Sequence, residues 1–129
     1  MIVLDASALV DVVTEHRNAL AVVEHLEQPL IAPGHQQAEV LSAIARLVRA
    51  DELSAEEARQ ALITVSDLEQ EVVVASGRHL QRALELQDRI RVLDGLYVAL
   101  AEQLGVPLLT TDARLVGADP PCDVILATA

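Results

Sequence analysis

Short apolar runs alternate along the chain with longer stretches in which apolar residues recur at helical spacing. The short runs are rich in leucine and β-branched residues, a composition typical of buried parallel strands. They occupy residues 2–4, 30–32, 72–74, 107–109 and 124–126. The pattern therefore predicts about five strands separated by helices.

The helical stretches carry their own start and stop signals. Ser54 followed by Glu57 is a capping box that opens a helix running to about residue 68, and Ser76 begins another that reaches about residue 90. Three further helices are predicted over residues 18–26, 39–48 and 93–104. This strand and helix order predicts an α/β fold: a three-layer α/β/α sandwich with a parallel sheet, folded as a single domain over residues 1–129.

Four carboxylates lie at the ends of apolar runs or inside apolar helices, where acidic residues are unusual. Asp5 follows the run 2–4, Glu39 opens one apolar helix, Asp94 interrupts another, and Asp112 follows the fourth predicted strand. Sites in α/β sandwiches gather outside the carboxyl ends of the strands, and helix N-termini favour carboxylates. We therefore expect all four to converge. Burying one ionised acid costs several kcal/mol, so four of them require a shared cation.

The donor chemistry indicates which cation. Mg²⁺ and Mn²⁺ take oxygen ligands, and carboxylates around such ions suit phosphodiester hydrolysis. The four histidines show no zinc-ligand spacing. For Asp94 and Asp112, helix capping explains the position equally well, because Asp is a favoured N-cap residue. The sequence leaves that alternative open.

Composition restricts the function further. The net charge of -11 disfavours non-specific contact with a phosphate backbone, and the absence of Phe and Trp removes base-stacking platforms. The absence of lysine excludes a P-loop and lysine-based catalysis. Cys122 is the only cysteine, so no internal disulfide forms, and no run reaches the roughly 18 apolar residues of a membrane span. We expect a cytoplasmic protein without membrane contact.

The segments around the four carboxylates resemble the acidic motifs of PIN-domain nucleases, in particular the VapC-type toxins of bacterial toxin–antitoxin pairs. The matching segments are MIVLDASALV at 1–10, AEVLSA at 38–43, LDGLYVALA at 93–101 and LLTTDARL at 108–115. They follow the family's order and span nearly the whole chain. Gly95 stands where alanine is commoner in the family, and we expect it to loosen the start of its helix.

This resemblance implies a Mg²⁺- or Mn²⁺-dependent endoribonuclease that acts as a toxin and is inhibited by a cognate VapB-type antitoxin. It also implies a homodimer, with an interface over roughly residues 78–104. The four carboxylates would be the metal-binding quartet. Ser7 and Thr110 match hydroxyl positions that flank the site in the family, although Ser7 could instead cap a helix.

An acidic nuclease needs local positive charge to approach RNA. Arg78 and Arg82 lie on one face of a predicted helix and could hold phosphate. Glu85 shares that face, so an ordinary solvated surface is the alternative. Arg46, seven residues after Glu39 on the same helical side, is a further candidate.

Other readings of the acidic α/β pattern fit less well. An aspartyl-nucleophile phosphatase needs a second aspartate where Ser7 stands, and both it and a receiver domain need a lysine. No G-x-G-x-x-G motif supports dinucleotide binding. The remaining alternative is a catalytically silent PIN-like module that works only by binding other proteins.

Overall fold

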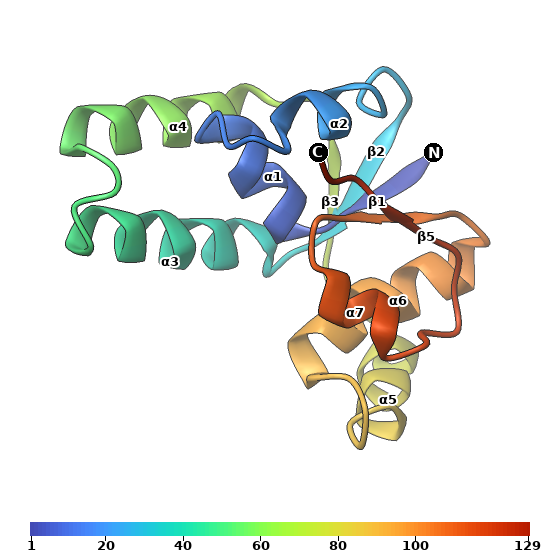
Figure 1. Cartoon of the computed structure of the whole chain (residues 1–129). Helices are drawn as coiled ribbons and strands as arrows, with labels where there is room; N and C mark the ends of the chain where they lie inside the picture. The colour runs from blue at the N-terminus through green and yellow to red at the C-terminus, as the bar shows by residue number, and fades with distance from the viewer.

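The computed structural model describes residues 1–129 and contains one five-stranded sheet in the order β3-β2-β1-β4-β5 (Figure 1). All neighbouring strands are parallel. The strands are β1 (Ile2–Leu4), β2 (Leu30–Pro33), β3 (Glu71–Val73), β4 (Leu108–Thr110) and β5 (Val124–Leu126). Each predicted strand is confirmed, with β3 and β4 displaced by one residue from the predicted runs.

Helices cover both faces of the sheet, which confirms the three-layer α/β/α sandwich (Figure 1). The helices α1 to α4 lie on one face, where α3 and α4 extend side by side beyond the strands, and α5 to α7 lie on the other. Their bounds are α1 (Ala6–Val13), α2 (Ala19–Val23), α3 (Gln36–Arg49), α4 (Ala55–Asp67), α5 (Gly77–Glu85), α6 (Val92–Leu104) and α7 (Ala113–Gly117). None of these helices has the length and apolarity that a membrane span requires.

Local capping chemistry sets two of the helix starts as predicted. Ser54 forms its capping box with Glu57 at the start of α4, and Ser76 forms one with His79 at the start of α5. The helix α5 ends at Glu85 and does not reach residue 90, because the chain turns there before α6 begins. The helix α2 is likewise shorter than predicted.

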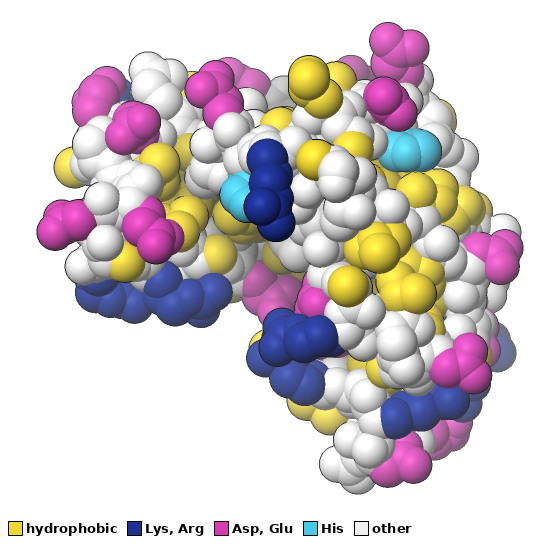
Figure 2. Space-filling view, viewed as in Figure 1, with side chains coloured by type: hydrophobic (Ala, Val, Ile, Leu, Met, Phe, Trp, Pro, Cys, Tyr) yellow, Lys and Arg dark blue, Asp and Glu magenta, His cyan; other side chains and the backbone are white.

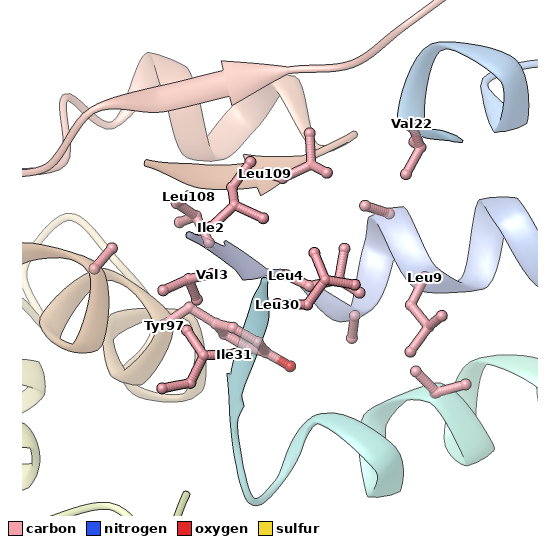
Figure 3. Close-up of a cluster of buried hydrophobic side chains, with 14 of the residues drawn as sticks. Ile2, Val3, Leu4, Leu9, Val22, Leu30, Ile31, Tyr97, Leu108 and Leu109 are labelled. Carbon is pink, nitrogen blue, oxygen red and sulfur yellow. The ribbon is translucent and has the colours of Figure 1, made fainter. Parts of the chain in front are cut away.

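The core is built on the central strand and on α6. Ile2, Val3 and Leu4 of β1 are completely buried, and Tyr97 of α6 packs against the sheet beside them (Figure 3). Gly95 allows α6 to approach α5 closely, since a Cβ at that position would lie 3.1 Å from the Cα and Cβ of Ala83. The helix α6 is continuous from Val92, and Gly95 has a packing role that its effect on the helix start did not suggest.

The strand order places a site between β1 and β4. From β1 the chain builds outward to β2 and β3, and then returns to form β4 on the other side of β1. The carboxyl ends of β1 and β4 therefore lie side by side at the point where the strand order reverses. Ligands of open α/β sheets bind in the crevice at this point.

Candidate functional site

A pocket of about 760 Å³ opens at the carboxyl ends of β1 and β4. The four carboxylates singled out in the sequence all line it: Asp5, Glu39, Asp94 and Asp112. In Figure 2, acidic side chains lie at the base of the notch between the α3 side and the α7 side of the molecule. Segments separated by more than a hundred residues therefore bring negative charge to one place.

Asp5 is the most enclosed of the four carboxylates, with 6% of its surface exposed. Its Oδ2 accepts hydrogen bonds from the hydroxyl of Thr110 at 2.6 Å and from that of Ser7 at 2.7 Å. Burial raises the pKa of Asp5, the two hydroxyl hydrogen bonds lower it, and the charges of Asp94 and Glu39 raise it further. The carboxylates are thus close enough to repel one another. Oδ1 of Asp5 receives no hydrogen bond from the protein and remains available to a ligand.

Ser7 does not act as a helix cap, which was the alternative explanation of its position. The N-cap of α1 is Asp5, and Ser7 lies inside the helix. Its hydroxyl donates to Asp5 and accepts a hydrogen bond from the backbone N–H of Thr111 at 3.2 Å. Ser7 therefore links α1 to the end of β4 and orients the buried carboxylate.

Glu39 lies near the N-terminus of α3 and is held by a residue that the sequence reasoning missed. The hydroxyl of Tyr97 donates a hydrogen bond of 2.8 Å to Oε1 of Glu39. Burial, followed by the charge of Glu39, raises the pKa of Tyr97, so the phenol stays protonated and can donate. One signal could have identified it: Tyr97 is the only aromatic residue among Phe, Trp and Tyr, and it lies three positions after Asp94.

The two remaining carboxylates are paired with arginines two or three positions away in the sequence. Arg91 Nε lies 3.2 Å from Oδ2 of Asp94, and Arg114 Nε lies 3.2 Å from Oδ1 of Asp112. Asp112 is also the N-cap of α7 and accepts a hydrogen bond from the backbone N–H of Arg114, so the capping explanation holds for this residue. It does not hold for Asp94, because the N-cap of α6 is Arg91.

The four carboxylates line the same pocket but do not surround one common metal-binding position. No group of three His, Cys, Asp or Glu side chains lies close enough together to hold a metal ion. Asp94 and Asp112 are instead engaged by Arg91 and Arg114, so the four carboxylates line one pocket, as expected, without forming a compact cluster. The donor chemistry nevertheless fits Mg²⁺ or Mn²⁺, because such ions take carboxylate oxygens, keep several waters and therefore need only one or two carboxylates from the protein.

Five of the nine arginines line two separate depressions. Arg46, Arg91 and Arg114 line the carboxylate pocket, and Figure 2 shows basic side chains on both sides of the notch. Arg78 and Arg82 line a separate depression of about 540 Å³ between α5 and α6. There Arg82 is bound to Glu102 and Glu85, at 2.8 Å and 3.0 Å respectively. The structure therefore does not bring these two arginines to the carboxylates.

Sequence comparison agrees with this geometry. A profile of the PIN domain family matches residues 2–119. The chain is 39% identical to ribonuclease VapC1 of Mycobacterium tuberculosis over 127 residues, which cover 96% of each protein. It is 40% identical to ribonuclease VapC12 of the same organism over 129 residues, with 89% of each covered. The chain therefore belongs to the PIN-domain family and, within it, to the VapC group.

Solved structures share the fold at lower identity. Mycobacterium tuberculosis VapC20, described as a sarcin–ricin loop cleaving toxin, superposes with a TM-score of 0.70 at 16% identity, covering 100% of both chains. A toxin–antitoxin complex from Klebsiella pneumoniae matches with a TM-score of 0.67 at 19% identity, covering 97% of this chain and 96% of the other. These similarities show that the α/β/α arrangement is that of the PIN domain.

Proposed function

We propose that the carboxylate pocket is the active site of an endoribonuclease that hydrolyses RNA phosphodiester bonds with Mg²⁺ or Mn²⁺, and that the chain is the toxin of a toxin–antitoxin pair. The observation that carries the proposal is the buried carboxylate of Asp5, which is surrounded by hydroxyl donors and lies close enough to Glu39 and Asp94 for their charges to raise its pKa. Relatives at 39% and 40% identity, named as ribonucleases, support the substrate class.

Each residue of the pocket has a defined part in this proposal. Asp5, Glu39, Asp94 and Asp112 would hold the cation. A bound divalent cation lowers the pKa of the attacking water and stabilises the charge that develops on the phosphate. The hydroxyls of Ser7 and Thr110 both donate to Oδ2 of Asp5, so that Oδ1 is free for the ion.

Positive charge at the rim of the pocket would hold the RNA phosphates. Arg91 and Arg114 are 77% and 89% exposed, and each can turn from its carboxylate to a phosphate without leaving a buried cavity. Arg46 reaches the same pocket from α3. These arginines would supply positive charge where the phosphates bind, although the net charge of the chain is -11, because phosphate binding depends on cations at the contact.

Two partners follow from the same features. An acidic pocket suits an arginine side chain, whose guanidinium makes paired hydrogen bonds with carboxylates, so a VapB-type antitoxin carrying such an arginine would block the site. A second copy of the chain is the other partner. Leu80 and Leu84 are large apolar side chains exposed on α5, within the segment expected to form a homodimer interface.

Cleavage of a defined, end-labelled RNA by the purified chain tests the proposal. We expect cleavage with Mn²⁺, none with EDTA, and a loss of at least about a hundredfold in Asp5→Asn, since the site would lose a charged ligand. Arg59→Ala is the matched control, because Arg59 pairs only with Glu56 on the exposed side of α4. A chain that fails to cleave any RNA with Mn²⁺ would instead support the catalytically silent interaction module.

A further inference from the structure

We infer that Tyr97 is a positioning residue of the metal site, which fixes one oxygen of Glu39 so that the other oxygen is available to the cation. The inference rests on the proposed function of the pocket. It adds Tyr97, a residue of the hydrophobic core, to the residues that determine the affinity for the metal.

The contact between Tyr97 and Glu39 joins a fully packed aromatic side chain to a partly exposed carboxylate. Tyr97 has no exposed surface and is packed among core side chains, and Figure 3 shows its hydroxyl oxygen directed away from α6. Glu39 has a side chain with several rotatable bonds and is 23% exposed. The 2.8 Å hydrogen bond from the phenol engages Oε1 of Glu39 and leaves Oε2 without a hydrogen-bond donor from the protein.

His35 reinforces this arrangement from the preceding turn. Its Nε2 lies 2.9 Å from the backbone carbonyl oxygen of Leu93 and 3.3 Å from Oε1 of Glu39. Its ring lies 4.8 Å from that of Tyr97, at 59°. His35 therefore connects the start of α3, which carries Glu39, to the start of α6, which carries Asp94.

The pattern at Glu39 repeats the one at Asp5. In both residues the protein's own hydroxyl donors engage a single carboxylate oxygen: Ser7 and Thr110 on Oδ2 of Asp5, and Tyr97 on Oε1 of Glu39. Groups that orient metal ligands in this way commonly account for a ten- to hundredfold difference in metal affinity. A phenol whose hydrogen bond served only to satisfy its own buried hydroxyl would not change the metal affinity.

The variant Tyr97→Phe removes the hydroxyl and keeps the ring in the core. We expect Mn²⁺ affinity, measured by calorimetry on the whole chain without RNA, to fall about tenfold. In a Glu39→Gln background the same substitution should have no further effect, because the residue through which Tyr97 acts has already changed. Thr64→Val is the control: it removes an exposed hydroxyl that bonds only to the carbonyl oxygen of Gln60 in α4.

Three outcomes separate this inference from the proposed function. Unchanged Mn²⁺ affinity in Tyr97→Phe, or an equal loss in the Glu39→Gln background, would overturn the inference alone. A wild-type chain that binds no Mn²⁺ would overturn the proposed function together with it. If Tyr97→Phe loses cooperative unfolding, His35→Gln takes its place in the same double-mutant cycle. A several-fold loss of Mn²⁺ affinity in His35→Gln that vanishes in the Glu39→Gln background supports the inference. Unchanged Mn²⁺ affinity in His35→Gln contradicts it.

Discussion

Thr110 and Asp5 are 105 positions apart in the chain and are joined by a hydrogen bond of 2.6 Å from the Thr110 hydroxyl to Oδ2 of Asp5. The contact follows from the pairing of β1 with β4, in which Leu4 lies opposite Leu109, so that the next residues emerge together at the edge of the sheet. Both groups are buried, and each satisfies the other. The ionised form of Asp5 is therefore stabilised by Thr110, a residue from near the other end of the chain.

Thr110→Val should destabilise the protein by about 1.5–3 kcal/mol at pH 7, because a buried carboxylate loses one of its donors while the side-chain shape is kept. Urea unfolding measures the change. The loss should shrink towards pH 4, where Asp5 takes up a proton. Thr64→Val is the control for removing a hydroxyl, and a loss that is the same at both pH values would show that Thr110 does not act through the charge of Asp5.

Asp5→Asn should raise the melting temperature at pH 7 in the absence of divalent cations. Burial raises the pKa of Asp5 in the folded protein above the ordinary value of 3.8. The folded state therefore holds this proton more tightly, and the stability that it contributes is lost as the pH rises through the folded-state pKa. The difference between variant and wild type, followed by circular dichroism, should disappear as the pH falls towards 4. A variant that melts below wild type at pH 7 would contradict this.

Added Mg²⁺ or Mn²⁺ should raise the melting temperature of the wild type. A ligand at a hundred times its Kd stabilises the folded state by about 2.7 kcal/mol, which corresponds to roughly 10 °C for a chain of this size. Differential scanning fluorimetry should show a much smaller shift in Asp94→Asn. Equal shifts in the two proteins would mean that the cation binds elsewhere, and Asp67→Asn, a change at the end of α4 outside the pocket, should behave as wild type.

Alanine substitutions of Arg46, Arg91 and Arg114 should each weaken RNA binding and reduce the slope of log K against log salt concentration by about one unit. Fluorescence anisotropy in EDTA measures binding without cleavage. The matched control is Arg78→Ala combined with Arg82→Ala, in the separate depression between α5 and α6. If only this double variant flattens the salt dependence, RNA contacts α5, as the helical spacing of these arginines first suggested.

Leu80→Glu combined with Leu84→Glu should convert a homodimer to a monomer, because both side chains are exposed on α5 and a charge there would have to be buried at an interface. Multi-angle light scattering at micromolar concentration measures the mass. Leu20→Glu, at an exposed position of α2, is the control and should leave the dimer intact. A wild-type chain that is monomeric under these conditions contradicts the proposed interface.

Local patterns in the sequence were sufficient for the strands, for two capped helix starts and for the choice of carboxylates. The capping boxes at Ser54 and Ser76 depend on residues three positions apart, and strand runs depend on neighbours, so both can be recognised without knowing the fold. The packing role of Gly95 could not be recognised in this way, because it depends on how closely α5 approaches α6. The same holds for Arg82, whose spacing suggested a phosphate contact and whose partner Glu102 lies on another helix.

The sequence by itself determined the α/β order, the strands and the four acidic residues, because each of these is encoded within one element or one motif. Only the tertiary structure decided which donors hold those acids: Thr110 for Asp5, and Tyr97 for Glu39. It also decided which arginines lie beside them. The physical reason is that a carboxylate's orientation and pKa depend on burial and on neighbours 58 or 105 positions away, and parallel strand order, with no local signal, brings those neighbours together.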